Sequence, residues 1–402
     1  MKRRYKILLV LLAILLLAQV PFVYRRYQTG RLAQKVTQLE SQRLRREHPQ
    51  YNEYKGIIHA HTSLGGHSTG GFDELIDAAN QNDLDFVLMT EHYSDKYDTS
   101  ALTLNGVYGK TLFVGGNEID TANGDRFLMI PGSAEAASLR NLPTDQVLQK
   151  LHAENRVALI TYPERFKSWS SDFDGIEVFS NHTETKRVNP LLAAGDLLWS
   201  YPSYPQLTLM SYFRRPDANL QKFDETAAQR KLSLFAGTDA HSNIGFHLLG
   251  DDAGNKLIKI KLDPYATTFG IVRMHVLLFK GQEFNRENLL RALLFGQAFI
   301  GFDSLGDTSG FTFEATENDN WLQGMGGDVE WRPGLGLRAS APLNARFVIF
   351  KDGNRFFEES AKDQVSVEIS EAGTFRVEVY RDDLGPPFDK MPWIISNPIY
   401  VR

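Results

Sequence analysis

The chain is organised around the segment Ile57-Ile58-His59-Ala60-His61-Thr62-Ser63-Leu64-Gly65-Gly66-His67. Two histidines lie two residues apart at the end of a short β-branched run, and a third follows six residues later. Residues i and i+2 of a strand point to the same face, so a strand here places the imidazoles of His59 and His61 side by side. Convergent neutral imidazoles are ligands for divalent metal ions. Taken alone, the pattern also fits a strand end whose histidines face solvent, and the rest of the chain decides between the two.

Composition is that of a globular protein with an uneven distribution of charge. The 402 residues, 42% hydrophobic and 23% charged, suffice for one large α/β domain and a smaller one. The chain has no cysteine, which excludes disulfides and Cys-ligated zinc or iron–sulfur sites. Residues 1–50 hold 11 Lys/Arg against 2 Asp/Glu, whereas the remainder holds 33 basic and 47 acidic residues. A body this acidic is a poor binder of polyanions, so no nucleic-acid partner is expected.

The amino terminus predicts a membrane anchor. Four basic residues lie within Lys2–Lys6 and precede the apolar segment Ile7–Val23. As a helix this segment spans ~26 Å, slightly less than the ~30 Å hydrocarbon core of a bilayer, and side chains at its ends can reach the head groups. The alternative is a cleaved signal peptide, but Leu16 stands where cleavage after Ala18 needs a small residue.

We therefore expect residues 1–24 to form an uncleaved signal anchor that crosses the membrane once. A short basic amino terminus stays on the inner side, which places the body on the extracytoplasmic side, periplasmic or extracellular. Residues 25–50 are charged and rich in glutamine, with apolar residues at helical spacing. They predict a helical stalk that lifts the body off the membrane.

From Tyr51 onward, segments that predict strands and helices alternate. The expected strands are 57–58, 85–90, 111–114, 156–161, 175–179 and 232–236, and the expected helices are 72–81, 142–154 and 223–231. This alternation indicates a parallel sheet covered on both faces, either open or closed into a barrel. In barrels, chemistry gathers at the carboxyl ends of the strands.

Metal-binding residue types stand at these carboxyl ends. They are His59, His61, His92, Glu118, His182, Asp239 and His241, and His67 lies in the glycine-rich loop after the first strand. Surface histidines scattered at random would not follow one strand end after another. The clustering therefore favours a metal centre over solvent-facing histidines.

This arrangement resembles the PHP family (polymerase and histidinol phosphatase domains) of metal-dependent phosphoesterases. The motifs that carry the resemblance are His59-Ala60-His61 with His67, Thr90-Glu91-His92, Gly116-Asn117-Glu118-Ile119 and Gly237-Thr238-Asp239-Ala240-His241-Ser242. The resemblance implies an α/β fold with a distorted (β/α)7 barrel over residues 51–308. In layout the chain is similar to PHP proteins of the carbaryl-hydrolase type, which carry a carboxyl-terminal β domain.

The resemblance also implies a centre of two or three divalent ions, Mn²⁺, Zn²⁺ or Fe²⁺. By the family pattern, one ion is bound by His59, His61, Glu118 and Asp239, and another by His67, His92 and His241, with Glu118 bridging. A further ion normally takes a histidine from a His-Pro pair, where this chain has Tyr162-Pro163. Because a neutral phenol is a poor ligand for these ions, we expect that site to be weakened, with His182 as an additional metal ligand.

We assign catalysis to Glu118, His182 and Arg165. Two ions bridged by Glu118 and a hydroxide would polarise the substrate oxygen and supply the nucleophile near neutral pH. Arg165 follows a predicted strand and would hold an anionic group. Glu177 is expected either to orient a ligand histidine or to face the substrate.

The function expected from these residues is that of a membrane-anchored metal-dependent phosphoesterase. Its substrate would be a small-molecule or lipid-head-group phosphoester. Hydrolysis of a carboxylic or carbamate ester is the first alternative, because the same hydroxide can attack a carbonyl. A metal-binding sensor or scaffold without turnover is the second, and Tyr162 is the feature that keeps it open.

The carboxyl-terminal residues 309–402 predict a separate all-β module. Segments 311–315, 346–350, 365–369, 375–380 and 399–401 alternate apolar and polar residues with period 2. Asp352-Gly353-Asn354 is a hairpin signal between two of these strands. We expect a small β-sandwich without a catalytic role.

Overall fold

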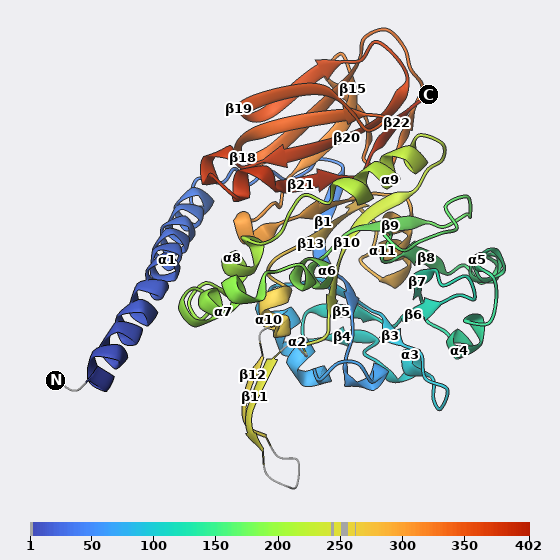
Figure 1. Ribbon diagram of the computed structural model, residues 1–402. Coiled ribbons are helices and arrows are strands. Elements are labelled where there is room, and N and C mark those ends of the chain that lie inside the picture. The colour runs from blue at the N-terminus through green and yellow to red at the C-terminus, as the bar shows by residue number, and fades with distance from the viewer. Residues whose placement is uncertain (1–2, 243–244, 251–255, 262) are drawn as a thin grey trace.

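The structure is a computed structural model that describes residues 3–242, 245–250, 256–261 and 263–402. Within these residues the chain is a mixed α/β protein with eleven α-helices, a large 20-stranded sheet and a separate two-stranded sheet. A single long amino-terminal helix projects from this body (Figure 1). The predicted α/β class and amino-terminal apolar helix are confirmed at this level.

Helix α1 (Arg3–Glu40) is continuous through both the predicted anchor and the predicted stalk. Its apolar residues 7–18 are exposed, whereas Phe22 is half-buried. In the described residues it is the one helix long and apolar enough to cross a membrane. Beyond the apolar run, Arg25 pairs with Asp196 of the body, and Arg43, just after the end of α1, pairs with Asp307. The charged part of α1 therefore packs on the body.

Parallel strands gather around β1 (Tyr51–Ala60), which pairs with β2 (Phe86–Met89) on one side and β10 (Ser233–Ala240) on the other. Strand β10 pairs in parallel with β9 (Gly175–Ser180), and β9 with β8 (Val157–Ile160). On the other side, β2 pairs with β5 (Thr111–Val114), and β3 (Glu91–His92) pairs with β6 (Asn117–Asp120). The carboxyl ends of these strands consequently point the same way.

A hairpin that the periodicity did not predict interrupts this parallel order. Strands β6 and β7 (Arg126–Ile130) are antiparallel, and β7 is also antiparallel to β8. The turn between β6 and β7 contains Asn123-Gly124, with Gly124 at φ +79°. A left-handed glycine after asparagine is what such a turn requires.

Helices cover this part of the sheet. They are α2 (Phe72–Gln81), α3 (Thr99–Leu102), α4 (Ala136–Leu139), α5 (Thr144–Ala153), α6 (Asn181–Lys186), α7 (Pro190–Trp199), α8 (Pro205–Met210), α9 (Asp217–Ala227), α10 (Tyr265–Thr268) and α11 (Arg286–Leu294). The expected helices 72–81 and 142–154 correspond to α2 and α5. The helix expected at 223–231 instead runs from Asp217 to Ala227. Pro216 stands directly before it, and proline is compatible with the start of a helix.

Strands later in the chain connect the two parts of the molecule. β13 (Arg273–Phe279) pairs with β1 and with β14 (Ala298–Gly301), and β14 pairs with β21 (Pro392–Ser396). One apolar core extends from Tyr51 to Val401 across this junction. The two expected parts therefore share a core.

The carboxyl-terminal strands form antiparallel pairs for the most part. They are β15 (Thr312–Glu317), β16 (Asn320–Gly324), β17 (Asp328–Val329), β18 (Leu335–Lys351), β19 (Asn354–Glu368), β20 (Gly373–Tyr380), β21 and β22 (Ile399–Val401). The turn at Asp352-Gly353 joins β18 and β19 as predicted. These two strands are longer than the short segments expected, because bulges keep each continuous where the alternation breaks. The remaining strands are β4 (Gly106–Tyr108), on the edge of β5, and the hairpin of β11 (Gly245–Gly250) and β12 (Lys256–Lys261).

Candidate metal centre

The predicted strand-end residues converge at one point. His59 ends β1, His92 lies in β3, Glu118 in β6 and Asp239 in β10. Because these strands are parallel neighbours, their carboxyl ends meet. Three groups within the described residues could each hold a metal ion: His59, His61, Glu118 and Asp239; His61, His92 and His241; and His182, Asp239 and His241.

The backbone of β1 brings His59 and His61 together differently from a regular strand. The register of β1 against both neighbours shifts between Ile58 and Ala60, and His59 has φ +70°. Asp239, across from this bulge, also has a positive φ of 46°. Left-handed conformations in non-glycine residues are strained and concentrate at functional sites. The histidine pair therefore converges through a bulge, with ring centroids 5.1 Å apart.

Four buried donor atoms are spaced as metal ligands are. His59 Nε2 lies 3.6 Å from Glu118 Oε2 and 3.4 Å from Asp239 Oδ1. His61 Nε2 lies 3.4 Å from each of the same two oxygens. None of the four atoms has a hydrogen-bond partner among the described residues. Ligands about 2.1 Å from a central ion in tetrahedral geometry stand about 3.4 Å apart, so an ion satisfies all four.

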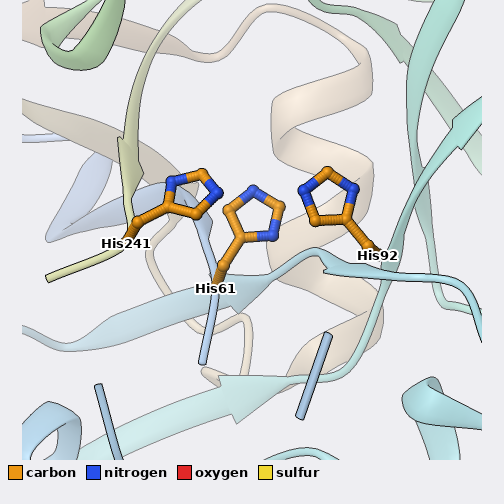
Figure 2. Close-up of side chains that lie close together, drawn as sticks. All are labelled: His61, His92 and His241. Carbon is orange, nitrogen blue, oxygen red and sulfur yellow. The ribbon is translucent and has the colours of Figure 1, made fainter. Parts of the chain in front are cut away.

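The second group lies beside the first and shares His61. Figure 2 shows the imidazoles of His61, His92 and His241 in a row, reaching in from separate strand ends. The His61 ring is 4.7 Å from that of His92 and 4.4 Å from that of His241, centroid to centroid. His241 Nδ1 donates to the backbone oxygen of Asp239 at 2.9 Å, which leaves Nε2 as its ligand atom. Nitrogen and carboxylate donors without cysteine suit Mn²⁺, Zn²⁺ or Fe²⁺.

The pKa values favour the ligand forms of most of these residues. Burial lowers the pKa of His61 to about 3 and also lowers that of His92, so both rings are neutral at pH 7. Burial alone would raise the carboxyl pKa values, but the neighbouring histidines hold the pKa of Glu118 at about 2 and that of Asp239 well below its usual range. His59 is the exception, because Glu177 and Asp239 outweigh burial and raise its pKa well above 6.5. A metal ion would displace that proton.

Glu177 orients His59. Its Oε1 pairs with His59 Nδ1 at 2.8 Å, and its Oε2 accepts a hydrogen bond from Thr161. A Cβ atom on Gly237 would stand 1.6 Å from Glu177 Oε1, so the carboxylate fits only because β10 carries glycine there. A carboxylate behind a histidine fixes the ring so that Nε2 faces the metal. Of the two roles expected for Glu177, the geometry favours this one.

Tyr162 stands at the position where the family resemblance leads one to expect a histidine. Its hydroxyl donates to Asp239 Oδ2 at 2.6 Å, and its backbone is left-handed at φ +53°. Burial and the negative charge of Asp239 raise the pKa of this phenol above its usual range, so it stays protonated. Tyr162 thus acts as a hydrogen-bond donor to a ligand carboxylate.

Arg126 is a residue of the centre that the sequence patterns missed. Its Nη1 lies 3.3 Å from Glu118 Oε1, its Nε donates to Asp120 at 2.7 Å, and its side chain is 36% exposed. The guanidinium carbon lies 5.3 Å from the centre of the Tyr162 ring. The signal was the Asn123-Gly124 turn, which folds Arg126 back onto β6.

The remaining predicted residues lie at the edge of the centre. His182 approaches His241 with ring centroids 5.3 Å apart. His67 is exposed, and its ring lies 4.7 Å from that of His92, outside the three groups. Arg165 is exposed, with its guanidinium 6.0 Å from the Tyr162 ring. Buried Glu91 accepts hydrogen bonds from Thr62 and so supports the loop that follows His61.

Comparisons with known proteins leave the family open. No family model and no curated protein matches the chain. The crystal structure of PsfC from Pseudomonas syringae PB-5123 is similar at 15% sequence identity, covering 63% of this chain and 94% of that one, with a TM-score of 0.37. A likeness this weak carries no argument, so function has to be argued from the side chains.

Proposed function

We propose that the chain is a membrane-anchored, metal-dependent phosphoesterase built on a PHP-type barrel. The observation that carries the proposal is the set of four buried, mutually spaced donor atoms of His59, His61, Glu118 and Asp239. Bound divalent ions would polarise a phosphoryl oxygen and activate water near neutral pH. The chain's own residues hold and orient those ions.

The strand pairings support the barrel. From β1 they run through β10, β9, β8, β7 and β6 to β3, and β3 follows β2 after a single residue, Thr90. Because β2 pairs with β1, this path returns to its start. Chemistry at the carboxyl ends of such strands is the usual arrangement in barrels.

Positive charge at the mouth favours a phosphoester over an acyl ester. Arg126 reaches Glu118 from the surface, and exposed Arg165 lies 6.0 Å from the Tyr162 ring that Arg126 also approaches. Guanidinium groups bind phosphoryl oxygens through two parallel hydrogen bonds, whereas a neutral ester offers no such charge. In this proposal Arg126 and Arg165 hold the phosphoryl group while His182 serves as a proton carrier beside His241.

Turnover and metal content test the proposal together. Full-length protein loaded with Mn²⁺ should hydrolyse p-nitrophenyl phosphate or its bis-ester. Asp239→Ala should lose bound metal and at least 100-fold in activity, whereas His152→Ala, on a surface helix face, should lose neither. Metal-dependent turnover of p-nitrophenyl acetate alone would establish the acyl-ester alternative, and bound metal without turnover of any of these esters would establish a sensor or scaffold.

The anchor is proposed to remain attached, with the body on the extracytoplasmic side. Arg25, just beyond the apolar run, pairs with the buried carboxylate of Asp196 and so holds this end of the anchor on the body. Because the chain has no cysteine, Ser360→Cys on the exposed face of β19 gives a single label site. A membrane-impermeant maleimide should label this cysteine in intact cells. Labelling only after lysis would show that the body lies on the cytoplasmic side.

A further inference from the structure

Helix α7 presents leucines to the outside of the molecule. Leu191 is 82% exposed and Leu198 is 66% exposed, and Leu192 is exposed between them. The outward face of a helix on a water-soluble surface is normally polar. Neighbouring exposed leucines therefore mark a surface that meets an apolar partner.

Helix α1 fixes which partner this is. Trp199 Nε1 donates to Gln19 Oε1 at 2.9 Å, and Arg25 Nε donates to Asp196 at 3.0 Å. Helices α1 and α7 touch so closely that a Cβ on Gly195 would stand 2.2 Å from the Phe22 ring. Figure 1 shows α7 beside α1. Helix α7 is thus level with the end of the apolar run of α1, where a bilayer gives way to its head groups.

A cavity of about 200 Å³ lies beneath α7. Most of its wall surface is apolar, from side chains that include Val188, Leu197, Leu209, Phe213 and Ile271, and Asp196 and Asp263 also line it. They come from α7, α8 and the segments around them, so the cavity lies between the membrane-facing helix and the body. A water-filled space with such walls is unfavourable, and an apolar guest is the matching occupant.

One wall of the cavity lies on α6, the helix that carries His182 of the candidate metal centre. Asn181 and Thr185 line the cavity on α6, and they flank His182, whose ring approaches that of His241. Asn181 is 3% exposed, and its Nδ2 donates to the Thr268 oxygen. Its Oδ1 has no hydrogen-bond partner among the described residues. A buried acceptor left open beside a cavity whose surface is mostly apolar suits a ligand hydroxyl.

We propose that this cavity binds the acyl chain of a membrane glycerolipid whose phosphoester is hydrolysed at the metal centre. The proposal rests on the phosphoesterase function proposed above and names its substrate class. The lipid enters past α7, its chain fills the cavity, and Asn181 Oδ1 accepts a hydrogen bond from the glycerol end. In the hydrolysis, the oxygen of one water joins phosphorus, the phosphorus–oxygen bond to the glycerol breaks, and the lipid alcohol leaves with a proton.

Photo-cross-linking reads occupancy of the cavity without requiring turnover. The probe is phosphatidic acid with a diazirine in the middle of one acyl chain, added to full-length Mn²⁺-loaded protein in phosphatidylcholine nanodiscs. Cross-links are expected in α8, which lines the cavity through Leu209. Ala193→Phe fills the cavity from α7 and should lower them at least fivefold. Ala194→Phe, exposed on the same helix and outside the cavity lining, should not.

Kinetics separate this proposal from the one on which it rests. In Ala193→Phe, the ratio of kcat/KM for phosphatidic acid to that for p-nitrophenyl phosphate should fall at least tenfold, with metal content unchanged. Cross-links confined to α1 and the outward face of α7, or an unchanged ratio, would overturn the acyl-chain site while leaving the phosphoesterase standing. Cross-links in α8 without phosphate release from either compound would support the site and overturn the phosphoesterase.

Discussion

The phenol of Tyr162 donates a hydrogen bond to Oδ2 of Asp239 at 2.6 Å, while Oδ1 of the same carboxylate is left to face His59 and His61. Tyr162 therefore stands where the resemblance to PHP proteins leads one to expect a metal-binding histidine, but it acts on a ligand of the other site. It fixes Asp239 so that one oxygen points toward the four-donor group. In the proposed centre, the same phenol that replaces a histidine would orient the Asp239 carboxylate toward an ion.

Replacement of Tyr162 should change the number of bound ions. Tyr162→His places an imidazole next to Asp239, and we expect about one additional equivalent of Mn²⁺ or Zn²⁺ by elemental analysis of the purified protein. Tyr162→Phe is the matched control. It should gain no ion, and its metal affinity should fall about tenfold because Asp239 loses the hydrogen bond that orients it. Equal metal content in the two variants would show that this position is not a ligand position.

Glu177 should matter for metal affinity although its two oxygens bond to His59 and Thr161 and it is in none of the candidate metal groups. Glu177→Ala leaves His59 Nδ1 without its buried partner and lets the ring turn, and loss of such a support costs about 10- to 100-fold in metal affinity. Glu177→Gln retains an acceptor of the same size and should recover most of that loss. Competition with a chromogenic chelator measures the metal affinity of each variant. If Glu177→Ala bound metal as tightly as the parent protein but lost substrate binding, the carboxylate would face the substrate instead.

Arg126 should act on substrate binding more than on the metal ions. Arg126→Ala removes the guanidinium at the mouth of the centre, and we expect KM for p-nitrophenyl phosphate to rise about tenfold, as for loss of one charged hydrogen bond. Arg126→Lys keeps the charge but loses the bidentate hydrogen-bonding geometry. Its KM should lie between those of the parent protein and Arg126→Ala. Arg355→Ala, an exposed arginine on β19, controls for net charge. A loss of metal content in Arg126→Ala, with KM unchanged, would assign Arg126 to the support of Glu118.

The site was more predictable from the sequence than the path by which the backbone builds it. His59, His92, Glu118 and Asp239 could be found because parallel strands force their carboxyl ends together. The bulge at His59 could not, since strand periodicity assumes regular φ and ψ, and a left-handed histidine is stabilised only by the packing around it.

Arg126 and the packing of helix α1 on the body were missed for a different reason. The importance of Arg126 depends on the β6–β7 hairpin, which pairs Asp120 with Arg126, and a search for parallel strands passes over that local turn. Likewise, charged residues after the apolar run resemble a solvated stalk. Only the fold supplies Asp196 as the partner of Arg25, so the sequence alone could not show that α1 packs on the body.

A buried ion-pair cluster away from the metal centre predicts how stability changes with pH. His275 is fully buried, with Nδ1 at 2.6 Å from Glu53 and Nε2 at 3.4 Å from Asp303. Burial alone would lower its pKa, but these carboxylates raise the pKa to about 9. A pKa raised above the unfolded value of about 6.5 stabilises the fold fully below pH 6.5, and the contribution is lost as pH rises toward 9. The contribution of His275 protonation to the free energy of unfolding is about 3 kcal/mol in total.

His275→Gln should remove this pH dependence. The amide keeps hydrogen-bonding capacity but cannot carry charge, so the variant should be less stable than the parent at pH 6.5 and nearly equal to it at pH 9. The comparison is made by thermal unfolding of the Mn²⁺-loaded full-length protein. Any effect of pH on the metal centre is then the same in both proteins and cancels in the difference between their Tm values. His152→Gln, beside Asp174 and half-exposed, should leave the parent's dependence intact. If the difference in Tm between His275→Gln and the parent stayed constant from pH 6.5 to 9, His275 would be neutral in the folded protein, and its ring would serve only to fill space between β1 and the segment around Asp303.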